Sequence, residues 1–376
     1  MNIHPCYTLR NLILAAVLSI GFASSALAQE RALLVDLNSK EATDLGTLGG
    51  ILSHANAIND TGQVVGYAYP ASGSSHAFIT GPDGAGMTDL GTLGGDYSTA
   101  YGINDAGQVT GYSQTDKGLE HAFITGPNGA RMTDLGTPGG NESIASGIND
   151  AGQVAGYFAT GRGVHAFITG PNGVGVTDLG TFGGNYSYAF GINGAGQVVG
   201  QSETGRGTRA FTTGPNGVGM TDLGTLGGNY SYAYGINDAG QVVGYSQTDK
   251  GLEHAFITGP DGVGMTDLGT LGGDYSNASG INDAGQVVGT SLTANGQTHA
   301  FITGPDGAGM TDLNSLVDLP PGVLLTNAAD INNGGQVIAT GVPEPETYAL
   351  LLAGLGLVVF MARGRARLHG NLPSQA

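Results

Sequence analysis

Histidine is the residue type in this sequence best suited to metal binding or acid–base chemistry, and it recurs in a regular pattern. Five histidines occupy the same place in a repeated His-Ala-Phe element: His76, His121, His165, His254 and His299. A zinc site gathers three or four ligands in one place, whereas each of these histidines belongs to a separate copy and has no second ligand at metal-binding spacing. One copy carries Arg209 instead. We therefore interpret the histidines as structural residues at strand edges, and expect neither a metal nor another cofactor.

Aspartates recur in a second element, Ile-Asn-Asp-x-Gly-Gln-Val. Its asparagine returns seven times: Asn59, Asn104, Asn149, Asn193, Asn237, Asn282 and Asn332. Calcium takes six to eight oxygen ligands, and one such turn offers only about two side-chain groups. The aspartate is also replaced by Gly194 in one copy and by Asn333 in another. We interpret the element as a turn that hydrogen-bonds its own backbone.

Catalysis requires a few residues with distinct roles in one place, and the sequence offers none that stands apart from the repeat. It has no G-x-S-x-G element and no glycine-rich loop followed by a phosphate-binding lysine. Residues 112–127 and 245–260 are identical. The single cysteine, Cys6, lies in a segment expected to be removed. We predict a non-catalytic protein; the alternative is a carbohydrate-active enzyme, a glycosidase or lyase, on the same scaffold.

Tyrosines are the better candidates for a binding role. Four of them follow Gly-Gly-Asp/Asn and precede serine: Tyr97, Tyr186, Tyr230 and Tyr275. We place them in the connections between successive repeat units, on one face of the molecule. A tyrosine offers a flat apolar ring and a hydroxyl, which suits stacking on a sugar ring or contact with a protein partner. The alternative is that they pack the junctions between units.

The elements that must position these residues are short strands. The asparagines are 44, 45 or 50 residues apart, and each period contains two hairpins, one closed by Asp-Ala-Gly and one by Gly-Pro-Asp/Asn-Gly. No window has the 3.6-residue period of an amphipathic helix. Four antiparallel strands in about 45 residues are typical of a propeller blade. The alternatives are an open solenoid and a glycine-rich disordered coat.

The two ends of the array favour a closed ring. The last unit supplies only its first hairpin, at residues 327–340, whereas residues 31–35 and 42–45 add strands before the first complete unit. We predict an all-β, seven-bladed β-propeller over residues 29–341, made of four-stranded antiparallel blades and closed by N- and C-terminal half-blades. Arg31 would then lie close to the strand around Val337.

The amino terminus has the features of a secretory signal peptide, residues 1–28. Arg10 precedes an apolar stretch at residues 12–22, and the segment ends in Ala26-Leu27-Ala28, an A-x-A cleavage site. Eleven apolar residues are too few for a membrane span of about 20 residues. We predict export by Sec-type machinery and cleavage by signal peptidase after Ala28; the alternative is an uncleaved anchor.

The carboxyl end carries three further parts. Residues 342–347 read Val-Pro-Glu-Pro-Glu-Thr, residues 348–362 are apolar, and arginines lie at residues 363–367. The apolar run, as a helix, would be a marginal transmembrane span, and the arginines would stay on the cytoplasmic side, so the preceding domain would lie outside. A polar tail follows at residues 368–376. The alternative is an ordinary single-pass anchor.

Two resemblances follow from these motifs. The carboxyl end resembles the PEP-CTERM sorting signal through Pro343, Glu344, Pro345, the apolar helix, and Arg363, Arg365 and Arg367. That family implies a Gram-negative, exopolysaccharide-producing bacterium and processing by a membrane-embedded exosortase. Residues 42–341 resemble the HAF extracellular repeat family, which implies a location and no activity.

Composition agrees with an exported repeat protein. Glycine makes up 70 of 376 residues, an excess that we attribute to turns and close backbone approaches. Residues 29–341 hold 28 acidic and 8 basic residues, a net charge of −20, which argues against nucleic acid and against anionic polysaccharide as partners. We predict an interaction module at the cell surface or in the extracellular matrix, binding a polysaccharide or surface protein.

Overall fold

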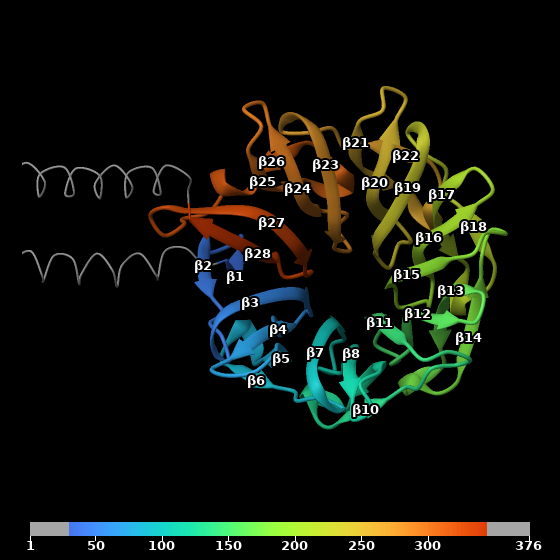
Figure 1. Ribbon diagram of the computed structural model, residues 1–376. Coiled ribbons are helices and arrows are strands. Elements are labelled where there is room, and N and C mark those ends of the chain that lie inside the picture. Colours follow the sequence, from blue (N-terminus) through green and yellow to red (C-terminus); the bar gives the residue numbers. More distant parts are fainter. Residues whose placement is uncertain (1–29, 344–376) are drawn as a thin grey trace, which may run out of the picture. The chain divides into compact units, whose positions relative to one another are not determined.

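Residues 30–343 are described by a computed structural model, and they contain 28 β-strands with short 3-10 turns between them. Residues 30–319 and 325–341 form one compact unit. Within it the strands group into four-stranded antiparallel sheets arranged in a ring around an axis (Figure 1). Two of the seven four-stranded sets are joined by a single parallel pair, Glu253 and Tyr275. We number the sets as blades 1 to 7 in the chain order of the strand that precedes the Ile-Asn turn, so that the set containing β1 is blade 7.

The strand bounds repeat closely from blade to blade. Blade 1 consists of β3 (Gly49–Ile58), β4 (Val64–Pro70), β5 (His76–Thr80) and β6 (Met87–Asp89). Blade 2 consists of β7 (Gly94–Ile103), β8 (Val109–Thr115), β9 (Glu120–Thr125) and β10 (Met132–Asp134). Blade 3 consists of β11 (Ser143–Ile148), β12 (Val154–Thr160), β13 (Gly163–Thr169) and β14 (Val176–Gly180). Blade 4 consists of β15 (Ser187–Ile192), β16 (Val198–Thr204), β17 (Gly207–Thr213) and β18 (Met220–Asp222).

The remaining blades follow the same plan. Blade 5 consists of β19 (Gly227–Ile236), β20 (Val242–Thr248), β21 (Glu253–Thr258) and β22 (Met265–Asp267). Blade 6 consists of β23 (Gly272–Ile281), β24 (Val287–Thr293), β25 (Thr298–Thr303) and β26 (Met310–Asp312). Blade 7 combines β27 (Val323–Ile331) and β28 (Gln336–Pro343) with β1 (Arg31–Asp36) and β2 (Glu41–Asp44).

Blade 7 closes the ring with strands from both ends of the array. β1 pairs with β28 in antiparallel register, with Arg31 opposite Gly341 and Val35 opposite Val337. The predicted closure by half-blades is therefore confirmed at the level of strand pairing. Figure 1 shows the first and last coloured strands side by side.

The hydrophobic core lies between neighbouring blades. One cluster joins Val65 and Ile79 of blade 1 to Ile103 and Phe123 of blade 2, and equivalent clusters occur at other junctions. The strand-three phenylalanines are at most 2% exposed: Phe78, Phe123, Phe167, Phe211, Phe256 and Phe301. Methionines of strand four, such as Met132, are only partly buried, because this strand forms the outer edge.

Glycine is required at two kinds of position. In the first hairpin turn, Gly240 has φ +75°, in the left-handed region that favours glycine. In strand two, a Cβ on Gly156 would lie 2.1 Å from the carbonyl oxygen of Ile144, which excludes any other residue without a backbone shift. In the second hairpin turn, the Asp or Asn before the last glycine takes the left-handed conformation as well, for example Asn128 at φ 55°.

Several predictions fall on residues outside the described range. These are the signal peptide with Ala26 and Ala28, the transmembrane helix at 348–362, the arginines at 363–367 and the tail at 368–376. Of the sorting segment, the described range includes only residues 342 and 343. Among residues 30–343, no helix has the length and apolar character needed to cross a bilayer.

Candidate binding site along the ring axis

A ring of asparagines links all seven blades at one end of the axis. Each asparagine Oδ1 accepts the backbone N–H of the glutamine four residues later, as in Asn149 and Gln153 at 3.0 Å. Each Nδ2 also donates to the backbone oxygen of the asparagine in the next blade, at 3.0 to 3.3 Å. The bond from Asn332 to Asn59 completes the circle. The asparagine therefore stabilises both its own turn and the junction to the next blade.

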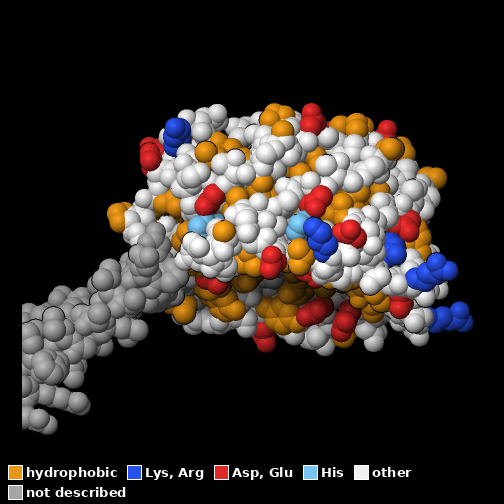
Figure 2. All heavy atoms as spheres, turned by 90° about the horizontal axis from the view of Figure 1, so that it is seen from above, with side chains coloured by type: hydrophobic (Ala, Val, Ile, Leu, Met, Phe, Trp, Pro, Cys, Tyr) orange, Lys and Arg blue, Asp and Glu red, His pale blue; other side chains and the backbone are white. Residues whose placement is uncertain are grey.

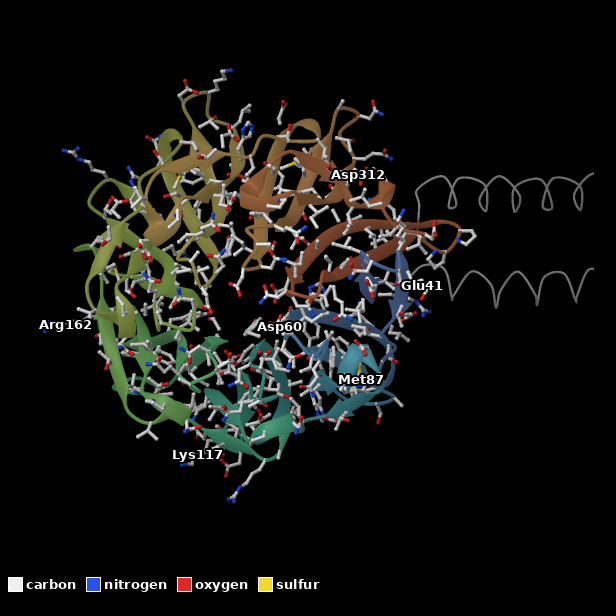
Figure 3. The ribbon with its side chains drawn as sticks, turned by 180° about the vertical axis from the view of Figure 1, so that it is seen from behind. Glu41, Asp60, Met87, Lys117, Arg162 and Asp312 are labelled. Atoms are coloured by element: carbon white, nitrogen blue, oxygen red, sulfur yellow. The ribbon has the colours of Figure 1, made fainter. Side chains whose placement is uncertain are left out.

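The aspartates of the same turns form a second ring of bonds. The Asp105 carboxylate accepts the backbone N–H of Asp60 at 3.0 Å, and Asp150 accepts that of Asp105. Gly194 has no side chain to accept from Asp150, so the junction between blades 3 and 4 lacks this bond. Figure 3 shows Asp60 beside the central opening. The predicted turn is confirmed, but its aspartate bonds to the neighbouring blade and not to its own backbone.

Replacing a ring asparagine should weaken a blade junction. Asn149→Ala removes the bond to the Asn193 oxygen, which still accepts the Gly196 N–H, and leaves the Gln153 N–H without its partner. We expect the free energy of unfolding to fall by about 2 kcal/mol. Asn104→Ala should cost less, because the bond from Asp105 to Asp150 remains at its junction. Urea denaturation of both variants measures the difference, with exposed Val218→Ala as control. Equal losses in the two variants would contradict this account.

Three consecutive cavities follow the axis and share lining residues. At the asparagine end, a cavity of about 230 Å³ is lined by the Ile-Asn-Asp turns of every blade. A second cavity of about 220 Å³ follows, which we call the neck; its lining includes Tyr101, Phe190, Tyr234 and Asp330. Beyond the neck lies a cavity of about 400 Å³, which we call the aromatic cavity. Its lining residues are Asn56, Tyr101, Ile144, Ser146, Tyr157, Phe190, Tyr234, Asn277 and Ser279.

The aromatic cavity breaks the repeat symmetry. The position three residues before the ring asparagine is aromatic in blades 2, 4 and 5, but small or polar in the other four blades. In blade order these residues are Asn56, Tyr101, Ser146, Phe190, Tyr234, Ser279 and Ala329. Aromatic rings from blades 2 to 5 thus line one side of the cavity, and asparagine and serine side chains from blades 1 and 6 line the other.

The aromatic rings contact one another across blades 3 to 5. Tyr157 meets Tyr188 edge-on with ring centroids 4.8 Å apart, Phe190 packs between Tyr188 and Tyr234, and Tyr234 stacks on Tyr245 at 6.0 Å. We call these five residues the aromatic arc. Burial raises the pKa of Tyr157 and of Tyr234 to about 12, so both hydroxyls are uncharged at neutral pH. The arc therefore offers apolar ring faces and neutral hydrogen-bonding groups.

A single carboxyl group, that of Asp330, stands in the neck. Its position, two residues before the ring asparagine, is glycine in five blades and Ala57 in blade 1. Asp330 accepts the backbone N–H of Ile58 at 3.2 Å and of Ile331 at 2.9 Å. Burial raises its pKa to about 7, and the nearby charge of Asp60 adds to the effect.

The four predicted binding tyrosines lie at the other end of strand one from the asparagines. Tyr97, Tyr230 and Tyr275 are inside β7, β19 and β23, and Tyr186 directly precedes β15. The sequence predicts these tyrosines in connections. Instead, a β-bulge lets the Gly-Gly segment pair with strand two, so strand one of blades 2, 5 and 6 extends past the tyrosine.

Three of their hydroxyls bond within their own blades. Tyr97 donates to Glu120 at 2.5 Å and Tyr230 to Glu253 at 2.6 Å, while Tyr186 shares a hydrogen with Thr208 at 2.8 Å. The bonds to glutamate help raise the pKa of Tyr97 and of Tyr230 to about 12. Tyr186 contacts the arc through Tyr188, with ring centroids 5.6 Å apart. The four tyrosines belong to four different blades, and none of them lines the aromatic cavity.

The histidines lie on the outer part of the blades. Each donates its Nδ1–H to the carboxylate of the strand-four aspartate of its own blade, at 2.6 to 2.8 Å, as His165 does to Asp178. Arg209 faces Asp222 and Arg31 faces Asp44 in the two blades without this histidine. In Figure 2, histidine, acidic and basic side chains are mixed on the outer surface. Among residues 30–343, no three His, Cys, Asp or Glu side chains gather as a metal site.

Sequence reasoning missed the aromatic cavity and Asp330. The sequence does carry a signal for them. When the copies are aligned on the ring asparagine, the third and fifth preceding residues vary most among the five nearest, and the second is small except at Asp330. The elements that recur in every copy, such as the Ile-Asn turn, stabilise the ring. The residues that differ between copies line the axis.

The carboxyl end of the chain matches a known sorting signal. Residues 341–366 match the family described as the PEP-CTERM protein-sorting motif. This motif indicates that the protein is exported, as predicted from the sequence. At the level of the whole sequence, no curated protein matches the chain.

Solved structures resemble the ring in fold. The TolB-type protein of Agrobacterium tumefaciens aligns with a TM-score of 0.51 at 11% identity, covering 83% of this chain and 98% of that one. The β-propeller domain of the Trilobed protease from Pyrococcus furiosus aligns with a TM-score of 0.53 at 10% identity, covering 78% and 92%.

An enzyme shares the same fold. A puromycin-hydrolysing peptidase of Mycobacterium tuberculosis aligns with a TM-score of 0.52 at 12% identity, covering 75% of this chain and 48% of that one. This chain therefore spans about half of that peptidase. At such identities the similarity concerns the fold alone, and residues 30–343 have the fold of a β-propeller.

Proposed function

We propose that the protein is a seven-bladed, non-catalytic interaction module that binds a polysaccharide through the aromatic cavity. The observation that carries this proposal is the aromatic arc. Two of its members, Phe190 and Tyr234, stand three residues before the ring asparagine, where four other blades have serine, asparagine or alanine, so ring closure does not require an aromatic residue there. Flat tyrosine faces bordered by hydroxyl and amide groups suit a sugar ring, which has apolar faces and polar edges.

We further propose how the protein reaches its place of action. Residues 1–28 direct Sec-type export and are removed by signal peptidase. The segment 342–367 is presented to an exosortase-like enzyme, with residues 348–362 in the membrane of a Gram-negative cell. The HAF-type ring then acts at the cell surface or in the extracellular matrix. The match at residues 341–366 supports this route.

A polysaccharide-binding screen tests the proposal. The full-length protein is mixed with insoluble or immobilised polysaccharides, and both retention and release of reducing ends are measured. Retention without release is expected. Release of reducing ends would establish the alternative, a carbohydrate-active enzyme, and absence of both would refute binding.

Two sets of variants locate the bound sugar. Phe190→Ser with Tyr234→Ser gives blades 4 and 5 the residue of blades 3 and 6, so the ring should fold while retention is lost. The quadruple alanine variant of Tyr97, Tyr186, Tyr230 and Tyr275 tests the site predicted from sequence. If the folded quadruple variant loses retention and the Phe190→Ser, Tyr234→Ser variant keeps it, the binding site lies on the face of the ring and not on the axis.

A further inference from the structure

Phe190 and Tyr234 of the aromatic arc line the same continuous space as Asp330. The neck shares Tyr101, Phe190 and Tyr234 with the aromatic cavity, and Asp330 lines the neck itself. A ligand that rests against the arc can therefore extend a group toward the Asp330 carboxylate. The two backbone N–H groups that this carboxylate accepts leave further lone pairs for a ligand donor.

The charges along the axis have a single sign. No lysine, arginine or histidine lines any of the three axial cavities, whereas Asp330 and the rim aspartates do. Figure 3 shows Lys117 and Arg162 at the outer edge of the ring, away from the axis. An anionic ligand would find no cationic partner along the axis, and a cation would find carboxylates at its end.

Uncharged polar side chains line the aromatic cavity beside the rings. Asn56, Asn277 and Ser279, from blades 1 and 6, present amide and hydroxyl groups there. Such groups can donate to or accept from the hydroxyl groups of a sugar. The cavity therefore combines apolar ring faces with polar groups that carry no charge.

Aromatic faces combined with a carboxylate are the usual surroundings of a bound ammonium group. We propose that the axial site binds a polysaccharide unit with a free primary amine, a hexosamine of the glucosamine type. Its sugar ring lies against the aromatic arc, and its ammonium group points to Asp330. This inference rests on the proposed function and specifies its ligand. An N-acetylated sugar lacks the charge, and its acetyl group would have to enter the neck beside Asp330.

The test compares two matched oligosaccharides on the full-length protein. A β-1,4-linked glucosamine hexamer and its fully N-acetylated counterpart are titrated by isothermal calorimetry, together with tyrosine fluorescence, which no tryptophan masks in this chain. We expect the glucosamine oligomer to bind about tenfold more tightly or better. Equal affinity for both oligomers would overturn the inference and leave polysaccharide binding intact, whereas binding of no polysaccharide would refute the proposed function itself.

Variants separate the axial site from general attraction to an acidic surface. Asp330→Asn keeps the shape of the side chain and should remove most of the preference for the amine form. Asp116→Asn removes the same charge from an exposed loop and should not change it. An unchanged preference in Asp330→Asn would overturn the inference, as would a lysine pentapeptide that binds as tightly as the amino sugar. The comparison of oligomers on the natural protein decides the question even if a variant fails to fold.

Discussion

Removal of residues 30–45, which carry β1 and β2, is expected to abolish cooperative folding of the ring. Leu33, Leu34 and Val35 are at most 5% exposed, and each such side chain contributes about 1.5 to 3 kcal/mol by burial. Their sum approaches the whole stability of an ordinary domain, about 5 to 15 kcal/mol. The loss also leaves β28 as an open edge and exposes the core shared with blade 1.

Thermal unfolding followed by circular dichroism measures this effect. The full-length chain should unfold in one sharp transition, and the chain that lacks residues 30–45 should show a broad transition or aggregate. A synthetic peptide of residues 30–45 added in trans is the control, because it can restore the pairing of β1 with β28. A shortened chain that unfolds at the natural midpoint would show that ring closure contributes little.

The same closure places a constraint on signal-peptide cleavage. β1 begins at Arg31, only two residues after the predicted cleavage site, and its first pair is Arg31 with Gly341. At the other end, β28 runs to Pro343, the first proline of the sorting motif. The blade that seals the ring is therefore built from residues directly beside both predicted processing sites. Cleavage a few residues inside either site would remove strand residues from blade 7.

The fold was largely predictable because the same pattern of strands and turns occurs in every copy of the repeat. A strand that is ambiguous in one copy is clear in others, and the half-units at the two ends together make one complete unit. The histidine position illustrates this regularity: Arg31 and Arg209 replace the histidine in blades 7 and 4, and both face the strand-four aspartate of their blades.

The candidate site was not predictable by the same reasoning, because the repeat describes what the blades share. Asn149 is in the repeat because it bonds the next blade, a contact 44 residues away that no local pattern reveals. Phe190 and Asp330 are exceptions to the repeat, so a search for recurring residues passes over them. The predicted placement of Tyr97 in a connection was wrong for a different reason. The bulge that brings Tyr97 into β7 depends on pairing with β8, which is not visible in the local sequence.

Asp330 should make the natural protein less stable as the pH rises. In the folded chain its pKa is about 7, whereas a carboxyl group in an unfolded chain titrates near pH 4. Between these values the folded state holds a proton that the unfolded state has lost, so the free energy of unfolding falls as the pH increases through this window. Above about pH 7 the loss is complete and amounts to roughly 4 kcal/mol at most.

Asp330→Asn removes this dependence and should therefore be stabilising at high pH. At about pH 8 its urea midpoint should exceed that of the natural protein, and near about pH 4 the two should coincide, because both side chains are then neutral. Asp116→Asn, on an exposed loop, controls for the loss of one negative charge. A natural protein whose stability is flat between about pH 5 and about pH 8 would contradict the shifted pKa. The carboxyl group partly offsets this cost by accepting the backbone N–H of Ile58, a bond that joins blade 7 to blade 1. A bound ammonium group would offset the cost further by stabilising the charged form of the carboxyl group.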